Sequence, residues 1–262
     1  MSGRSLRRIS GLGRFELLLF WRNRTAMFTA LLLPVGTVGF LASIGTATPG
    51  ELSADAFVLT GLFGFVLLYV VYYNLVSTYV ARREELVLKR LRTGEVTDAE
   101  IITGTAVPAM FVALAQSVAG VAAGAVLLDL PMPVNPVVLL GALLAGIALF
   151  VLLAAGSTVF TKNVEMAQLS TMPLLLVCFL GSGVMFPLDA LPDRLAEVLS
   201  FLPLTPVLEL ARLGWLGTDG SSAPTGFVGV FGAALGPFAI LVGWTLIGLY
   251  AFRRWFRWEP RR

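Results

Sequence analysis

The segment RREELVLKRLRTGEVTDAE (82–100) holds five basic and five acidic residues, and it lies between two long uncharged apolar runs, 56–80 and 105–128. A helix that crosses a membrane needs about 20 apolar residues, because each residue adds about 1.5 Å across a hydrocarbon core of roughly 30 Å. Both runs reach this length. The segment therefore predicts a membrane protein in which 82–100 projects from the lipid between two spans.

Apolar runs of this length recur along the whole chain of 262 residues, of which 57% are hydrophobic and 13% charged. The charged share is about half of that in soluble domains. Six runs qualify as spans, and an even number places both termini on one side of the membrane. The sequence predicts an all-α polytopic membrane protein with one transmembrane domain (25–251) of six transmembrane helices, at about 25–46, 56–80, 105–128, 137–160, 167–187 and 226–251.

Basic residues are confined to segments that would share one face of the membrane. Seventeen of the nineteen Lys and Arg residues fall in 4–24, 82–92, Lys162 and 253–262, whereas the alternate segments carry mostly acids. Because positive charge is retained on the cytoplasmic side, both termini are predicted to be cytoplasmic and the protein to lie in the cell membrane. The basic residues flank apolar runs, which indicates contact with anionic lipid and no nucleic acid partner.

Three segments outside the spans have their own patterns. Residues 1–24 alternate Arg with apolar residues at helical spacing, which predicts an amphipathic interfacial helix, with an unstructured basic tail as the alternative. The closely spaced prolines of 188–212 permit only short helices, so two brief re-entrant helices are expected in the outer leaflet before the sixth span. Residues 252–262 form a basic cytoplasmic tail.

The cytoplasmic segment 81–104 is predicted to be a helical hairpin. Leu86, Leu88 and Leu91 form an apolar strip, and Gly94 is a natural helix end. Thr97, followed three residues later by Glu100, predicts the start of a second short helix. The alternative is a solvated loop that only retains the topology.

The spans lack the groups that power transport. They contain no Asp, Glu, Lys, Arg or His, which disfavours proton or ion coupling, although backbone carbonyls of broken helices can still hold Na⁺. A phosphate-binding loop needs Gly-x4-Gly-Lys-Ser/Thr, and neither Lys89 nor Lys162 has glycines at that spacing. The chain is therefore expected to have no catalytic residues, metal site or cofactor, and to take energy from a partner.

Three stretches carry a resemblance to a known family: FWRNRTAMFTALLLPV (20–35), RREELVLKRLRTGEV (82–96) and GSGVMFPLDALPDRLAEVLSFLPLTPVLELAR (181–212). In the third, the spacing of a glycine, several prolines and the closing Arg212 is the most specific feature. The chain resembles the membrane permease subunits of type-2 ATP-binding-cassette (ABC) exporters, in the branch that includes drug- and antibiotic-resistance permeases.

The resemblance implies a half-transporter. A second permease copy, identical or related, would face this one, and two copies of a separate ABC ATPase would bind and hydrolyse ATP with Mg²⁺. It also implies roles for three groups of residues. The ATPase-coupling candidates are Arg83, Glu84, Glu85, Leu88, Arg90, Leu91 and Arg92, with Lys162 and Glu165 as a second contact. The extracellular gate would contain Gly183, Pro187, Pro192, Pro203 and Pro206.

Polar residues within the spans are weaker indicators of a substrate pathway. The candidates are Tyr73, Asn74, Ser77, Thr78, Gln116 and Gln168. Such groups more often pair between helices than contact substrate. Similarly, Gly120-x-x-x-Gly124 fits close helix packing within one subunit better than a seam between subunits.

The expected function is outward transport of an amphipathic or hydrophobic substrate, such as a drug, an antibiotic or a lipid-like compound. The main alternative is a non-transporting membrane sensor or scaffold that binds a soluble partner through 82–100. A passive channel or an ion-coupled carrier is disfavoured by the uncharged spans.

Overall fold

The computed structural model describes residue 36 and residues 54–87, 97–127, 131–184, 188, 191–219 and 224–256. Within these ranges the regular structure is entirely helical. The predicted interfacial helix (1–24), all but residue 36 of the predicted first span (25–46) and most of the basic tail (252–262) lie outside the described residues.

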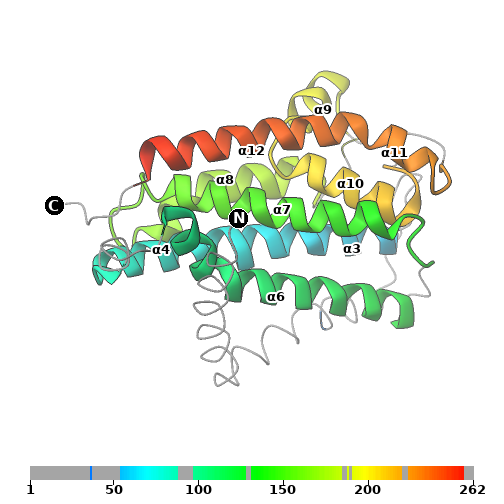
Figure 1. The fold of residues 1–262 in the computed structure, drawn as a ribbon. Coiled ribbons are helices and arrows are strands. Elements are labelled where there is room, and N and C mark those ends of the chain that lie inside the picture. The colour runs from blue at the N-terminus through cyan, green and yellow to red at the C-terminus, as the bar shows by residue number, and fades with distance from the viewer. Residues whose placement is uncertain are drawn as a thin grey trace.

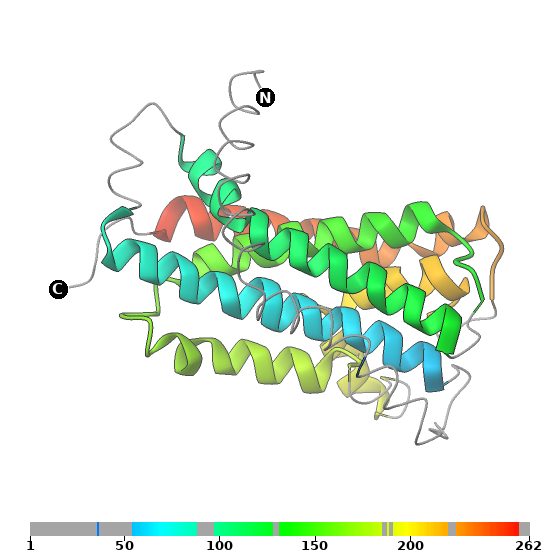
Figure 2. The same ribbon diagram turned by 90° about the horizontal axis from the view of Figure 1, so that it is seen from below.

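The helices form an elongated bundle, in which most of them run along its long axis (Figures 1 and 2). We call its two ends the Arg83 end, where α4 and α7 finish, and the Trp215 end, where α3 and α7 begin. In chain order the elements are α3 (Ala54–Phe65), the π-helix η1 (Val66–Tyr73), α4 (Asn74–Glu84), α6 (Asp98–Leu127), α7 (Pro136–Ser157), α8 (Ala167–Gly181), α9 (Asp193–Ser200), α10 (Thr205–Leu216), α11 (Gly229–Ala233) and α12 (Leu235–Trp255).

Among the described residues, four helical stretches are long and apolar enough to cross a membrane: Leu59–Glu84, Asp98–Leu127, Pro136–Ser157 and Leu235–Trp255. They confirm helices at the second, third, fourth and sixth predicted spans. The fifth predicted span is shorter than expected, because α8 has 15 residues and extends only about 22 Å. The bent pair α9–α10, with 94° between its helices, counts as a fifth crossing if it is taken as one span, so the full number of six remains a prediction.

Helix boundaries follow local sequence signals. Helix α7 begins where expected, because the side chain of Asn135 accepts a hydrogen bond from the Val138 N–H and Pro136 occupies the first turn. Helix α6 differs from the expectation: the predicted short helix at Thr97 continues into the third span as one helix of 30 residues. The expected start of the sixth span is divided: α11 (Gly229–Ala233) is followed by a break at Ala234, and α12 begins at Leu235. Pro237 has no N–H to bond the carbonyl of Ala233, so one continuous helix is disfavoured there.

The interior of the bundle is built around α3, η1 and α4, which pack against α6, α7, α8 and α10. Glycines permit the closest approaches. A Cβ at Gly120 of α6 would lie 2.7 Å from Leu62 of α3, and one at Gly214 of α10 would lie 2.5 Å from the backbone of Leu139 in α7. Gly120 is thus used for packing within the chain, as the interpretation of its motif favoured.

Helix α12 lies at the edge of the bundle. Only 11% of its most apolar stretch is buried, against 72% for Leu59–Glu84. It contacts chiefly α7 and α10. Its outer face, which includes Leu246, Ile247 and Tyr250, is apolar and exposed, as expected of a helix that faces lipid.

Candidate functional site

Arg83, a predicted coupling residue, is buried at the end of α4 with 1% of its surface exposed. Its Nη1 donates to the carbonyl of Thr158 at 3.1 Å, and its Nη2 donates to the carbonyls of Thr161 at 2.6 Å and Lys162 at 3.2 Å. These carbonyls follow the C-terminus of α7, where a helix leaves acceptors unpaired and carries partial negative charge. Arg83 therefore joins the start of the charged segment 81–104 to the turn between α7 and α8.

That turn is further fixed to α8. The hydroxyls of Thr161 and Ser170 lie 2.6 Å apart, and the Asn163 side chain accepts a hydrogen bond from the Met166 N–H at the start of α8. Lys162 and Glu165 remain exposed. The turn is thus anchored on its inner side and presents the two predicted contact residues outward.

Glu84 and Glu85 are exposed immediately after buried Arg83. Helix α4 ends at Glu84, and Leu86 has a φ of +60°, a backbone conformation that is uncommon for residues other than glycine. The expected helix through Leu86 therefore does not continue directly from α4. Leu88, Arg90, Leu91 and Arg92 lie outside the described residues.

The second arm of the predicted hairpin forms the first turn of α6. The Thr97 N–H donates to Glu100 Oε2 at 2.8 Å, and the Glu100 N–H donates to Thr97 Oγ1 at 3.4 Å. This is a reciprocal capping box. One turn further on, the Tyr79 hydroxyl of α4 donates to the Ile102 carbonyl at 3.0 Å, so α4 and α6 are held together at the Arg83 end.

The candidate pathway residues have different surroundings. Thr78 donates to the Asn74 carbonyl at 2.8 Å, which is a local bond within α4. Tyr73 and Ser77 are half-buried, whereas Gln168 is exposed on α8. Gln116 is buried in α6, and its Oε1 accepts no hydrogen bond from the described residues. Among the described residues, the hydrogen bonds within this set join only Asn74 and Thr78, so no common polar site is defined.

The predicted gate stretch contains a buried cation, Arg212. Arg212 of α10 is 4% exposed; its Nε donates to Thr60 Oγ1 of α3 at 3.1 Å, and its Nη2 donates to the Gly183 carbonyl at 2.6 Å. Its guanidinium carbon also lies 5.2 Å from the ring centroid of Phe57, within the range of cation–π attraction. Arg212 thus joins α3, α10 and the segment after α8.

Gly183 fits this contact for two reasons. Its φ is +73°, and a Cβ there would lie 3.2 Å from Arg212 Nη1. Pro192 precedes α9, and Pro206 lies in the first turn of α10, where a missing N–H is tolerated. Pro203 is buried between the two helices, and Pro187 lies outside the described residues. Of the described gate candidates, Gly183 contacts Arg212, whereas Pro192 and Pro206 mark the starts of α9 and α10.

The expected helices of 188–212 are present, but α10 is more deeply buried than a helix that only dips into the outer leaflet. It packs against α7, α12 and α3. In its last turn, Trp215 Nε1 donates to the Pro131 carbonyl at 2.9 Å. Sequence reasoning noted Arg212 only as part of a family pattern. Its signal was a basic residue within the largely apolar stretch 202–216, whose one other charged residue is Glu209.

Comparison with known proteins gives one match. The family model described as ABC-2 type transporter matches residues 7–215, about four fifths of the chain. The match includes the Arg83 junction, the Arg212 junction and five of the six predicted spans. No curated protein matches the chain.

Proposed function

The chain belongs to the ABC-2 type transporter family, and from this premise we propose that it exports an amphipathic or hydrophobic substrate across the cell membrane, powered by a separate ABC ATPase. ABC-2 membrane domains typically work with such a partner. In this proposal the partner subunits bind ATP and Mg²⁺, two permease copies face each other, and the Arg83 end is cytoplasmic. The substrate is a drug, an antibiotic or a lipid-like compound, in keeping with the apolar spans.

The observation that carries this proposal is the buried junction at Arg83. Exposed Glu84 and Glu85 offer charges to a partner, and the adjacent guanidinium is bonded to the turn before α8. A displacement applied at the carboxylates is thereby transmitted to α4, α7 and α8 together. Lys162 and Glu165 lie on the same turn and provide the second partner contact.

Co-purification tests the coupling assignment. The permease is co-expressed with an ATPase encoded beside it, and Glu84 and Glu85 are both replaced by Lys. We expect the ATPase to be lost from the complex, because two charges at the contact are reversed. The matched control is Asp193→Lys with Glu197→Lys, which reverses two exposed carboxylates on α9.

The outcomes separate the functions. Retention of an ATPase that still hydrolyses ATP in step with added hydrophobic substrate would show that the coupling assignment to Glu84 and Glu85 is wrong. If the wild-type chain instead binds a kinase or regulator and stimulates no ATP hydrolysis, the sensor or scaffold alternative is favoured.

A further inference from the structure

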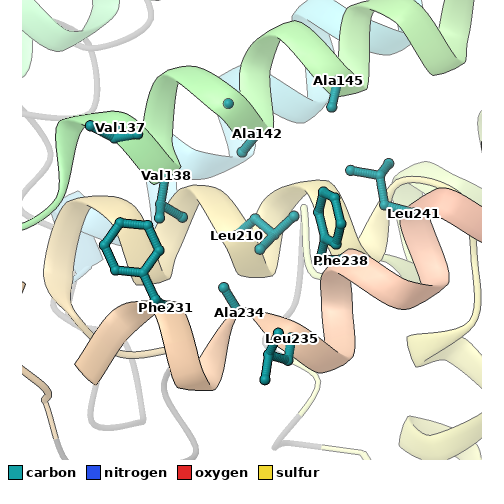
Figure 3. A pocket seen from close by; sticks show the side chains of 11 residues that line it. Val137, Val138, Ala142, Ala145, Leu210, Phe231, Ala234, Leu235, Phe238 and Leu241 are labelled. Carbon is teal, nitrogen blue, oxygen red and sulfur yellow. The ribbon is translucent and has the colours of Figure 1, made fainter. Parts of the chain in front are cut away.

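A cavity of about 310 Å³ lies between α7, α10, α11 and α12, in the half of the bundle towards the Trp215 end (Figure 3). Its floor is buried and includes Ala142, Leu210 and Leu241. Its rim is open, with Leu235 69% exposed and Phe238 54% exposed. All of the lining side chains are hydrocarbon, from Val, Ala, Leu and Phe, beside one glycine.

Small residues create this space. Gly141, Ala142 and Ala145 on α7 line it together with Ala234, at the break between α11 and α12. Figure 3 shows the short side chains of Ala142, Ala145 and Ala234 along the cavity. The segment before α11 is joined to the start of α7, because Asn135 Nδ2 donates to the carbonyl of Phe227 at 2.9 Å. Glycine and alanine in the lining therefore leave space between helices that are linked at one end of the cavity.

The lining determines what can bind. Water and polar ligands need hydrogen-bond partners, and burying them without partners costs several kcal/mol. An engineered cavity of about 150 Å³ lined by similar side chains binds benzene, so twice that volume suits several methylene groups.

The position of the cavity along the membrane-spanning helices narrows the class of apolar ligand. The flanking helices α7 and α12 are both candidate membrane spans. The stretch of α7 that lines the cavity, Val137 to Ala145, covers about 12 Å and begins one residue after the helix start. This matches the depth of one leaflet, about half of a 30 Å hydrocarbon core. The open rim therefore meets the hydrocarbon chains of a single leaflet.

We propose that this cavity binds an acyl chain of a membrane phospholipid from the leaflet at the Trp215 end. The chain completes the packing of α12, which is otherwise the least buried of the four long spans. The inference requires only that the protein is embedded in a membrane, and it holds whatever the substrate or direction of transport.

Photolabelling in membranes tests the site directly. Vesicles that contain the full-length permease are supplied with a phosphatidylcholine that carries a diazirine on one acyl chain, and the labelled peptides are mapped by mass spectrometry. We expect labelling in 137–145 and 231–241. Gly141 lines the cavity, and a Cβ there has no neighbour within 4 Å. We therefore expect the Leu side chain of Gly141→Leu to occupy part of the cavity and the labelling to be lost.

Gly243→Leu is the matched control. Gly243 also lies within a helix, also has no neighbour within 4 Å of a built Cβ, and does not line the cavity. We expect this variant to label as the wild type does. Equal labelling of Gly141→Leu and wild type would overturn the proposal, because it would show ordinary contact of lipid with the surface.

Thermal unfolding of delipidated protein in detergent gives a second, independent readout. Added phosphatidylcholine should raise the Tm of the wild type and of Gly243→Leu, because it binds the folded state, but not that of Gly141→Leu. If a diazirine-bearing aromatic compound labels 231–241 and excess phosphatidylcholine does not displace it, the acyl-chain assignment is wrong and the cavity takes ring compounds. Neither assay requires ATP or an ATPase subunit, so failure here is distinct from failure of the proposed function.

Discussion

At the scale of single residues, the largest side chain that is fully buried among the described residues is the charged one of Arg83. A guanidinium removed from water costs several kcal/mol unless it is well paired. The carbonyls of Thr158, Thr161 and Lys162 accept its hydrogen bonds. They lie in the turn after α7, where the partial negative charge of the helix end favours a cation. The side chain and the turn thus stabilise each other, which makes Arg83 a positioning residue.

Replacement of Arg83 by Met should therefore destabilise the protein. Each buried carbonyl left without a donor costs about 1–3 kcal/mol, so we expect the free energy of unfolding to fall by at least about 2 kcal/mol. Arg83→Lys should be intermediate, since one ammonium cannot reproduce the planar fork. The Tm in detergent measures the effect, and Arg254→Met, at an exposed position on α12, should leave it unchanged.

If Arg83 also helps to couple the ATPase to the membrane helices, Arg83→Lys should have a second effect. In the assembled complex, substrate should no longer stimulate ATP hydrolysis, although the basal rate persists. If substrate still stimulates ATP hydrolysis normally in a variant complex whose Tm is lowered, Arg83 has a structural role only.

Gly183 provides a test at the other buried cation. Gly183→Ala introduces a Cβ at positive φ and close to Arg212 Nη1, so we expect a loss of about 1–3 kcal/mol. Gly243→Ala, in the middle of α12 with open space around it, should be neutral or stabilising, because alanine is favoured over glycine in a helix by up to about 1 kcal/mol. Equal effects in the two variants would contradict the role of the Gly183 backbone. The Tm values of the two purified variants and the wild type measure these effects.

The spacing of residues along the helix indicates that Arg83 is buried, although the distribution of charge along the chain does not. Tyr72, Val76, Tyr79 and Arg83 follow each other at spacings of four, three and four, and all four are buried. Such spacing marks one face of a helix. The basic cluster showed only on which side of the membrane the residue lies. The three carbonyl partners are backbone groups about 75 residues away, and no side-chain pattern predicts them.

At the scale of elements, the start of α6 shows how far a local motif reaches. The capping box of Thr97 and Glu100 was readable from the sequence, and the structure confirms it. We expect Thr97→Ala to destabilise the protein by about 1 kcal/mol. Thr103→Ala, which removes a hydroxyl exposed one turn later, should have a smaller effect. Hydrogen exchange of the amides of the first turn of α6 localises the change, and equal protection in both variants would argue against the cap.

Element boundaries were predictable where a stop or start signal is present. Asn135 and Pro136 mark the start of α7, and Pro237 accounts for the break at Ala234 before α12. The uninterrupted α6 was not predicted. Hydropathy changes at residue 104, which suggested a boundary there, but helix-forming residues continue across this position. The deep position of α10 depends on Gly214 packing against α7, a tertiary contact between distant segments.

At the scale of the whole molecule, the described helices place charge unequally between the two ends. α12 ends near the end of α4 (Figure 1), which brings Arg253 and Arg254 to the side of the bundle that holds Arg83 and Lys162. The loop before α7 lies at the other end and carries no basic residue. This distribution favours a cytoplasmic Arg83 end under the positive-inside rule.

Cysteine labelling tests this orientation in a simple background, because the single native thiol, Cys178, is buried. Glu85→Cys and Lys162→Cys introduce thiols at exposed positions of the Arg83 end, and Met132→Cys introduces one at a position 82% exposed in the loop before α7. A membrane-impermeant maleimide added to intact cells should label Met132→Cys alone, and the other two only after permeabilisation. The wild-type chain, unlabelled in both conditions, is the control. Labelling of Glu85→Cys in intact cells would invert the topology, place the exposed carboxylates away from any cytoplasmic ATPase, and remove the physical basis for coupling through Arg83.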